Sequence, residues 1–329
     1  MQTPRTNGEK FFIVGGAGFI GSHFTDELLL RRGAAAVTLY DNFSSGREWH
    51  YDAHKNDPRF RVVRGDVKDI EFMKKAMDGH SVVIHLASNP DIARAAVEPT
   101  VDFYEGTLLT HNVVEAMRCT SPKRLLYASG SGVYGDLGQV ECQEDHGPML
   151  PTSTYGASKM AGEMLLCSYA AMFDLSGCAF RFGNVVGPRQ THGVGYDFVR
   201  RLLKDPTQLR ILGDGTQSKS YIHVSDVVNA VLHAHENTKE NFQAYNVATG
   251  DYITVREIAM IAVESLGLQA DKVDFQFGTT PRGWKGDVPV VRLNTDRIKA
   301  LGWKCGRSTA MALRDSILAM IPDAREGRL

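Results

Sequence analysis

Short apolar runs alternate, through the first half of the chain, with longer segments whose apolar residues recur at helical spacing. The short runs are rich in Val, Ile, Leu and Phe, which is typical of buried strands. We expect strands at 11–14, 37–40, 61–64, 82–85, 125–128 and 178–182. Segments 22–32 and 107–118 have helical spacing and are long enough to connect parallel strands. The alternation predicts an α/β fold with a doubly wound parallel sheet.

The pattern changes in the second half of the chain, where loops containing glycine and proline become frequent. Helical segments are expected there at 255–266 and 309–320. One more strand is expected at 244–247, so residues 221–250 would return to the sheet. We predict a first domain at 1–185 and a smaller, discontinuous C-terminal part at 186–329 whose loops face a substrate.

Composition and charge narrow the classes of function. The chain has 37 basic and 38 acidic residues, so it lacks the basic field that non-specific nucleic-acid binding requires. Its apolar runs fall short of the roughly 20 residues of a membrane span, and its first residues contain no apolar signal core. The five cysteines show no spacing typical of a metal site or a disulfide framework. We expect a cytoplasmic protein without metal, nucleic acid or membrane partners.

A glycine-rich sequence, GGAGFIG, follows the first predicted strand and precedes a helix. Glycine permits a tight turn and lets an anion approach backbone N–H groups, while the helix dipole adds positive potential. This predicts a pyrophosphate site at Gly15, Gly18, Phe19 and Ile20. The spacing is G-x-x-G-x-x-G instead of the general G-x-G-x-x-G, and a purely structural turn is the alternative.

Asp41 strengthens the interpretation as a dinucleotide site. It ends the second predicted strand, 20 residues after Gly21. A carboxylate there can accept hydrogen bonds from the adenosine ribose and would repel a 2′-phosphate, which favours NAD over NADP. The other predicted cofactor contacts are Asn42, Ser45, Gly46, Asp66, Val67, Leu86, Ala87 and Ser88. A strand-end turn at 65–67 and a core strand at 85–88 are the alternatives for the last five.

A candidate catalytic pair lies in the sequence TYGASK. Tyr155 and Lys159 are four residues apart, so on a helix they project from one face. Tyrosine, with an ordinary pKa near 10, is a weak base at neutral pH, but an adjacent ammonium and a positive nicotinamide ring both favour the phenolate. The pair therefore predicts a proton shuttle beside a dinucleotide, with an ordinary amphipathic helix as the alternative.

Taken together, the motifs GGAGFIG, HLAS, YASGSGVYG, YGASK, RFGNVVGPR, GDGTQSKSYIHVSD and RGWKGD make nearly the whole chain resemble one family. This is the extended short-chain dehydrogenase/reductase family, in its NAD-dependent epimerase/dehydratase branch, and UDP-glucose 4-epimerase-like proteins are the most similar. The resemblance implies a Rossmann-type sheet that binds NAD. It also implies that Tyr155 removes the proton of the sugar 4-hydroxyl while C4 passes hydride to NAD, and that Lys159 holds the nicotinamide ribose and lowers the pKa of Tyr155. Return of hydride to the other face of the transient 4-keto sugar would complete an epimerisation.

The resemblance also implies a nucleotide-sugar site and a dimer. The corresponding substrate-binding residues are Asn184, Arg189, Arg210, Leu212, Lys219 and Arg282. Arg189 would reach the C6 end of the sugar, Arg210 and Leu212 a uracil-like base, and Lys219 the diphosphate. Relatives dimerise through a helix bundle that contains the catalytic helix, so a homodimer is expected. The predicted substrates are UDP-glucose and UDP-galactose, or UDP-glucuronate and UDP-galacturonate.

Two positions depart from the family pattern. The family has Ser or Thr where this chain has Gly130, and we predict that Ser129 supplies the missing catalytic hydroxyl, with Ser131 as the alternative. Gly106 stands where many relatives have Asn. Dehydratases carry an Asp-Glu pair where this chain has Ser131 and Gly132, which disfavours dehydration. A net oxidoreductase or decarboxylase, or a weakly active NAD-binding regulatory protein, are the alternative functions.

Overall fold

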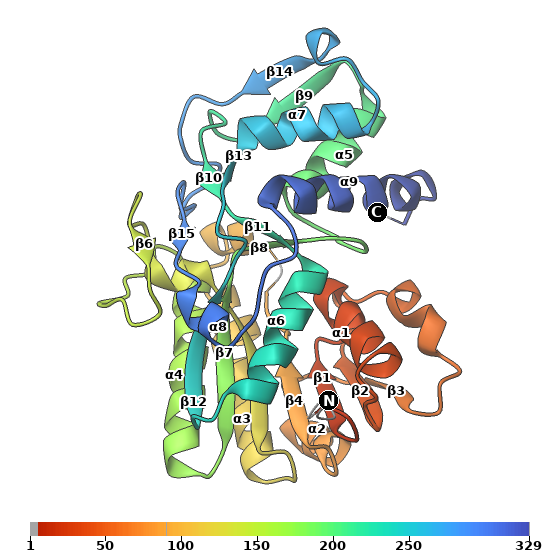
Figure 1. Ribbon diagram of the computed structural model, residues 1–329, viewed down its shortest axis with the longest axis vertical. Coiled ribbons are helices and arrows are strands. Elements are labelled where there is room, and N and C mark those ends of the chain that lie inside the picture. Colours follow the sequence, from red (N-terminus) through yellow and green to blue (C-terminus); the bar gives the residue numbers. More distant parts are fainter. Residues whose placement is uncertain (1–5, 90, 329) are drawn as a thin grey trace.

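The computed structural model describes residues 6–89 and 91–328 and centres on a seven-stranded parallel sheet (Figure 1). The strand order is β12-β7-β5-β4-β1-β2-β3. The strands are β1 (Lys10–Val14), β2 (Ala36–Asp41), β3 (Phe60–Arg64), β4 (Val82–His85), β5 (Arg124–Gly130), β7 (Ser176–Phe182) and β12 (Phe242–Val247). This confirms the predicted doubly wound, Rossmann-type α/β fold.

Helices cover both faces of the sheet, which explains why its strands are apolar throughout. The helices are α1 (Phe19–Leu30) and α6 (Val224–Asn237) on one face, and α2 (Ile70–Met77), α3 (Leu108–Arg118) and α4 (Thr154–Met172) on the other. Phe11 and Ile13 of β1 pack towards the first pair, whereas Phe12 and Val14 pack towards the other three. The alternation of strand side chains therefore builds two cores from one strand.

The strand order reverses between β1 and β4, because the chain passes from β3 at one edge back to the middle of the sheet. Ligands of open α/β sheets bind in the crevice outside the carboxyl ends of the strands at such a switch point. Gly15 directly follows β1, and residues 86–88 directly follow β4. The predicted phosphate loop and the HLAS sequence therefore meet at this crevice.

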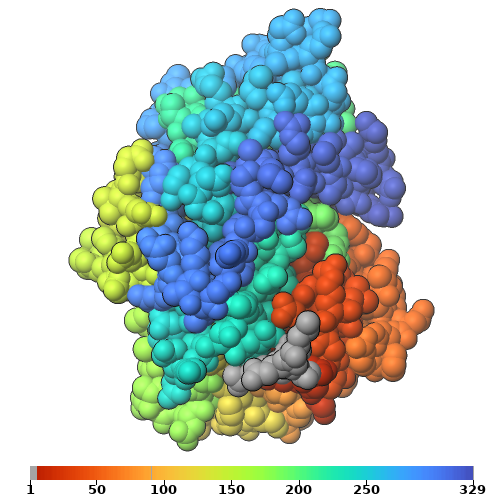
Figure 2. Space-filling model, in the orientation of Figure 1, coloured from red at the N-terminus to blue at the C-terminus, as the bar shows by residue number. Residues whose placement is uncertain are grey.

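The C-terminal half adds a second cluster of elements at one end of the sheet, at the top of Figure 1. It consists of α5 (Val194–Lys204), β9 (Gln208–Ile211), α7 (Val255–Ser265), β14 (Asp274–Phe277) and α9 (Thr309–Arg325), which share an apolar core. β14 pairs with β9 in parallel. In the space-filling view, the C-terminal residues (dark blue) lie across the middle of the visible face (Figure 2).

Short strands and helical turns complete the fold. The short strands are β6 (Glu141–Cys142), β8 (Asn184–Val186), β10 (Ser218–Lys219), β11 (Tyr221–His223), β13 (Ile253–Thr254) and β15 (Arg292–Leu293), and α8 spans Asp296–Ala300. The short helical turns are η1 (Glu48–His54), η2 (Ile92–Ala96), the π-helical η3 (Phe103–Thr107), η4 (Ser131–Tyr134) and η5 (Ala270–Lys272). In the part of the chain that the structure describes, no helix combines the length and apolar character that crossing a membrane requires.

Candidate active site

The phosphate loop packs directly against the chain that leaves β4. Gly15 has a φ of 77°, and a Cβ on it would lie only 2.7 Å from the backbone nitrogen of Ala87. The following helix α1 begins with Gly18 as N-cap, with no capping side chain and no acidic residue in its first turn. The N–H groups of this turn, which includes Phe19 and Ile20, can therefore bind an anion such as a pyrophosphate.

Replacing Gly15 by Ala is expected to raise the dissociation constant for NAD about tenfold or more, because the added methyl group must push the loop away from Ala87. Gly79 provides a matched control. It has a similar φ of 81°, but a Cβ there meets nothing within 4 Å. Gly79→Ala should cost only about 1 kcal/mol of stability and leave NAD affinity unchanged, as measured by titration calorimetry and urea unfolding.

Asp41 lies beside the phosphate loop, buried under the segment that follows β2. Its carboxylate oxygens accept hydrogen bonds from the N–H groups of Ala17, at 2.9 Å, and Phe43, at 2.8 Å. Burial raises the pKa of Asp41 despite these bonds. Gly46 packs onto Asp41 so closely that a Cβ would come within 3.0 Å of Oδ1. A carboxylate has about four acceptor positions, so each oxygen of Asp41 can still accept a ribose hydroxyl.

The remaining predicted cofactor residues lie on loops around this carboxylate. The Asn42 side chain donates a hydrogen bond to Asp66 Oδ2 at 3.2 Å, and the carbonyl of Val67 accepts one from Asn112 at 3.1 Å. Ser45 belongs to the same loop as Asn42, directly before Gly46. The structure therefore brings the loops after β2 and β3 together, as an adenosine site needs.

His50 also supports the phosphate loop, although nothing in the sequence pattern marks it. Its Nδ1–H donates to the carbonyl of Ala17 at 2.8 Å. The ring is almost completely buried, and burial lowers the pKa of His50 to about 4. The imidazole is therefore neutral at physiological pH and acts as a fixed donor beneath the loop.

Stability is expected to fall as the pH decreases from about 6.5 towards 4. His50 takes up a proton near pH 6.5 in the unfolded chain but only near pH 4 in the folded protein, so acid favours unfolding. His23, with a pKa of about 4, and His85, with a pKa of about 3, add to the effect in the same direction. Urea unfolding at about pH 5 and pH 7 should show a smaller difference for His50→Gln than for the parent protein. The exposed His111 serves as the control, and an equal change in His111→Gln would contradict this account.

The catalytic helix α4 places the predicted pair on one face. Ser153 caps the helix by accepting a hydrogen bond from the N–H of Gly156, and Lys159 Nζ lies 5.5 Å from the centre of the Tyr155 ring. Lys159 is 4% exposed and donates to the carbonyl of Ala128 at 2.9 Å. Burial lowers the pKa of Lys159 to about 8. The ammonium is therefore still largely protonated near neutral pH.

The electrostatic balance at Tyr155 differs from the prediction. Burial raises the pKa of Tyr155 to about 12, while a side-chain hydrogen bond with Ser88 lowers it and the charge of Asp102 raises it. The prediction considered the ammonium of Lys159 and neglected the loss of water around the phenol. Desolvation outweighs the nearby positive charge in the protein alone.

Asp102 is a functional candidate that the sequence analysis missed. Only 1% of it is exposed, and its carboxylate accepts hydrogen bonds from Asn89 at 2.9 Å and from Thr154 at 2.7 Å. It therefore fixes the start of the catalytic helix against the turn η3. Within η3, a Cβ on Gly106 would collide with the Ser158 hydroxyl, so the glycine allows the close approach of this turn to α4. No local sequence signal marks Asp102, because its partners come from two other segments.

Ser129, the predicted source of the catalytic hydroxyl, bonds to a buried carboxylate in the structure. It is 5% exposed, and its hydroxyl donates to Glu163, which forms a buried ion pair with Arg181 at 2.7 Å. Ser131 begins the turn η4, one residue beyond the strand. A Cβ on Gly130 would meet no atom within 4 Å, so the position of the family hydroxyl opens into free space. The buried charges thus hold the Ser129 hydroxyl, and its catalytic role stays a prediction.

Asn184 and Lys219, two of the predicted substrate-binding residues, lie close to each other where β8 pairs with β11. Asn184 contacts the backbone of Ser220, the neighbour of Lys219. Lys219 Nζ forms an ion pair with Asp287 at 2.7 Å. The ammonium therefore already has a carboxylate partner, which a diphosphate would have to replace.

Arg282 and Leu212 lie close to the same carboxylate. Arg282 donates to the Asp287 carbonyl and pairs with Asp136, and Leu212 lies beside residue 283. Arg210 is exposed on β9, where its carbonyl accepts a hydrogen bond from a neighbouring arginine of α5. The structure thus gathers Asn184, Lys219, Leu212 and Arg282, and it places Arg210 on the adjoining strand.

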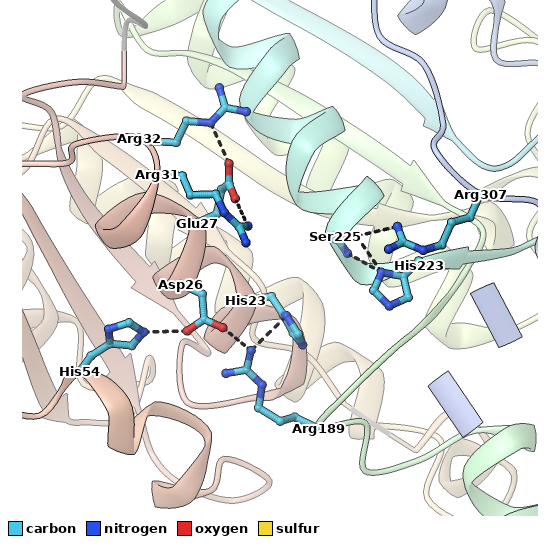
Figure 3. Close-up of polar contacts among 10 residues, drawn as sticks. All are labelled: His23, Asp26, Glu27, Arg31, Arg32, His54, Arg189, His223, Ser225 and Arg307. Carbon is cyan, nitrogen blue, oxygen red and sulfur yellow. Dashed lines mark hydrogen bonds and ion pairs between the residues drawn. The ribbon is translucent and has the colours of Figure 1, made fainter. Parts of the chain in front are cut away.

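Arg189, predicted to contact the sugar, makes its polar contacts with α1 and η1 in the structure. Its φ of 65° directs the side chain to α1, where the guanidinium pairs with Asp26 and contacts His23 at 3.1 Å (Figure 3). It also donates to the carbonyl of His50 at 2.8 Å. Burial opposes ionisation of Asp26, but the hydrogen bond and charge of Arg189 hold the pKa of that carboxyl below its ordinary value. Arg189 thus connects the loop after β8 to the phosphate-binding helix.

The geometry agrees with what is known of similar proteins. The model of the NAD dependent epimerase/dehydratase family matches residues 11–248. A UDP-glucose 4-epimerase from Mycolicibacterium smegmatis is 32% identical over 302 residues, covering 90% of this chain and 93% of that protein. A crystal structure of UDP-galactose 4-epimerase has a TM-score of 0.84 at 35% identity, covering 96% of this chain and 99% of its own. The UDP-glucose 4-epimerase of Thermus thermophilus in complex with NAD has a TM-score of 0.82 at 30% identity, covering 94% of this chain and 98% of its own.

The relatives are not all epimerases. They include a dTDP-glucose 4,6-dehydratase from Actinoplanes sp. and a UDP-N-acetyl-alpha-D-glucosaminuronate decarboxylase from Bacillus cytotoxicus. The uncapped start of α1, the close approach at Gly15 and the position of Asp41 fit NAD as cofactor. The chain is an enzyme of the extended short-chain dehydrogenase/reductase type and belongs to the NAD-dependent epimerase/dehydratase family.

Proposed function

We propose that the protein catalyses epimerisation at C4 of a UDP-linked hexose through a transient 4-keto sugar. The substrates would be UDP-glucose and UDP-galactose, or UDP-glucuronate and UDP-galacturonate. The observation that carries the proposal is the position of Tyr155 and Lys159. Lys159 donates a hydrogen bond to the carbonyl of Ala128 on β5. Tyr155 is hydrogen-bonded to Ser88, which follows β4 next to the phosphate loop. A proton acceptor thus lies at the crevice where the cofactor binds.

In the proposed reaction, Tyr155 accepts the proton of the sugar 4-hydroxyl and returns it after the sugar has turned. NAD, when bound, supplies the acceptor for the C4 hydride and the source of its return, so no external oxidant is consumed. Lys159 contributes a positive charge that favours the phenolate, and its bond to the Ala128 carbonyl fixes that charge near the ring. Asp102 holds the start of α4, which keeps Tyr155 in place.

The residues after β5 support epimerisation over dehydration. Elimination of water across C5 and C6 requires an acid and a base in addition to Tyr155. Ser131 and Gly132 begin η4 at the positions where the resembling dehydratases carry an Asp-Glu pair. Neither residue can act as a carboxylic acid or a carboxylate base, so dehydration lacks its usual groups.

We propose that residues 186–329 bind the nucleotide part of the substrate and that residues 1–185, with 221–250, bind NAD. Lys219 pairs with the carboxylate of Asp287 and Arg282 donates to its backbone carbonyl, so together they would provide the positive charge for a diphosphate. Both would exchange a carboxylate for a phosphate oxygen on binding. Asn184 lies beside Lys219 and would contact the sugar end of the same group.

The direct test is to incubate the purified enzyme with UDP-glucose, UDP-galactose, UDP-glucuronate and UDP-galacturonate separately, without added NAD, and to follow the sugars by NMR. Interconversion of one pair to the same equilibrium from both directions supports the proposal. Formation of a 6-deoxy-4-keto sugar, loss of carbon dioxide, or a requirement for stoichiometric NAD would contradict it. The tightly bound NAD of the purified enzyme is quantified first, so that an unloaded preparation is not mistaken for an inactive one.

We also propose that the enzyme is a homodimer formed through α3 and α4. Met164 on α4 and Phe103 and Tyr104 on the adjacent η3 are exposed apolar side chains. Burial of such side chains against a second copy would be favourable. Light scattering should give twice the chain mass, and Met164→Glu should reduce it to the monomer mass.

A further inference from the structure

Tyr155 is expected to need a hydroxyl group beside its phenolic oxygen, and the structure excludes two of the places from which one could come. Gly130 has no side chain, and the space that its Cβ would occupy is open. The hydroxyl of Ser129 is held by Glu163, and that carboxylate also accepts hydrogen bonds from the guanidinium of Arg181. Turning the Ser129 hydroxyl towards Tyr155 would remove one hydrogen bond from the buried Glu163 carboxylate, which is unfavourable.

Ser88 is the hydroxyl that does contact Tyr155. Asp102 bridges Asn89, the residue after Ser88, to Thr154, the residue before Tyr155, at 2.9 and 2.7 Å, and a side-chain hydrogen bond with Ser88 lowers the pKa of Tyr155. The backbone position of Ser88 is well determined, because the preceding Ala87 packs against Gly15 of the phosphate loop, and the following Asn89 is bonded to Asp102. The hydroxyl therefore lies on a segment held between the cofactor loop and the catalytic helix.

Because β4 and β5 are adjacent, Ser88 after β4 can supply the hydroxyl that the family carries at the position of Gly130, at the end of β5. β4 and β5 are parallel neighbours, and His85 is paired with Tyr127. β5 continues to Gly130, whereas Ser88 lies three residues beyond the end of β4, so both residues are at the same carboxyl edge of the sheet. Neighbouring strands are about 4.8 Å apart, so hydroxyls at the ends of β4 and β5 can approach the same phenolic oxygen.

We propose that Ser88 is a catalytic residue, whose hydroxyl replaces the one missing at Gly130 by hydrogen bonding to the phenolic oxygen of Tyr155 during proton transfer. This inference rests on the proposed function. The proton leaves the sugar 4-hydroxyl and joins the Tyr155 oxygen, and it returns to the sugar oxygen in the second half of the reaction. Ser88 keeps its own proton throughout, because it only donates a hydrogen bond to the phenolate.

The other groups around Tyr155 define what Ser88 must add. Lys159 and Tyr127 face it from α4 and β5, His85 lies on β4 behind Lys159, and Asp102 faces it from the segment before η3. Lys159 favours the phenolate, whereas Asp102 and burial oppose it. The Ser88 hydrogen bond lowers the pKa of Tyr155, so its removal leaves burial and the charge of Asp102 to raise that pKa further.

The test compares Ser88→Ala, Ser88→Thr and the double variant Ser88→Ala/Gly130→Ser in the NAD-loaded enzyme. We expect Ser88→Ala to lower kcat roughly 10- to 100-fold near neutral pH with little change in KM, and to shift the low-pH, rising limb of the kcat profile to higher pH. Ser88→Thr keeps a hydroxyl and should retain most of the activity. Gly130→Ser in the double variant should restore kcat, because the backbone at Gly130 is extended and its Cβ enters free space.

A second measurement does not depend on turnover. Ultraviolet absorbance of tyrosinate, taken as the difference between each protein and its Tyr155→Phe version, reports ionisation of Tyr155 directly. Ser88→Ala should move this ionisation to higher pH. An unchanged tyrosinate titration, or a loss of kcat in Ser129→Ala larger than that in Ser88→Ala at equal stability, would overturn the role of Ser88. If the parent enzyme converts none of the sugars while Ser88 still controls the titration, the proposed function fails and the Ser88–Tyr155 interaction stands.

Discussion

The Tyr155→Phe enzyme is expected to lose about 10²- to 10⁴-fold in kcat while it keeps its fold and its NAD. The change removes one oxygen atom, which is the proton acceptor in the proposed reaction. The ring stays packed beside Lys159, so the aromatic contact and the burial of the ammonium are retained. KM for the nucleotide sugar should change little, because the diphosphate is bound elsewhere. Initial rates with saturating substrate give the effect.

Tyr245→Phe is the matched control for this experiment. Tyr245 lies on the edge strand β12, is buried, and shares a hydrogen bond with Thr238 at 2.8 Å. Like Tyr155→Phe, the Tyr245→Phe change removes a phenolic hydroxyl from a buried ring, but at a position away from the crevice. We expect a stability loss of about 1 kcal/mol and an unchanged kcat. Equal activity in the Tyr155 and Tyr245 variants would contradict the assignment of Tyr155.

Glu163→Ala is expected to reduce the free energy of unfolding by about 3–5 kcal/mol. Glu163 is 0% exposed, and its partner Arg181 is nearly as buried. Removing the carboxylate leaves the guanidinium as an uncompensated buried charge and also deprives the Ser129 hydroxyl of its acceptor. Glu163 does not contact Tyr155 in any interaction described above. The variant should therefore unfold at lower urea concentration, and any soluble fraction should retain a normal KM.

The exposed pair of Arg314 and Glu264 is the control for this charge effect. These residues form an ion pair of similar length, 2.8 Å, but about half of each side chain is exposed. Water solvates either charge when its partner is removed, so Glu264→Ala should cost no more than about 1 kcal/mol. If the two glutamate variants lost the same stability, burial would not be the reason for the importance of Glu163.

The sheet was predictable because its strands are buried on both faces. Every strand predicted from an apolar run lies within an observed strand, including 244–247 within β12. The glycine loop and the Tyr155–Lys159 pair were also recognisable, since their geometry depends on residues within one turn or one strand-to-helix connection. Local sequence is sufficient where the partners are local.

The contacts that the sequence could not show are those of side chains whose partners are distant in sequence. Ser129 bonds to Glu163, 34 residues away, and Arg189 pairs with Asp26, 163 residues away. Both have predicted roles from their place in a motif, and in the structure each donates to a carboxylate, fully buried for Glu163 and partly exposed for Asp26. Asp102 was missed for the same reason, because its role depends on Asn89 and Thr154.

The edge strand β12 has a consequence for how the protein is made. During synthesis, the ribosome completes β1 to β7 by residue 182. The second neighbour of β7, β12, follows only with residues 242–247. Helix α6, which covers one face of the sheet, is made shortly before β12. Until then, the nascent chain exposes the backbone edge of β7 together with the apolar side chains of Phe180 and Phe182. An open apolar edge invites pairing with other chains. A fragment ending at residue 185 should therefore aggregate, whereas one ending beyond β12 can close its sheet.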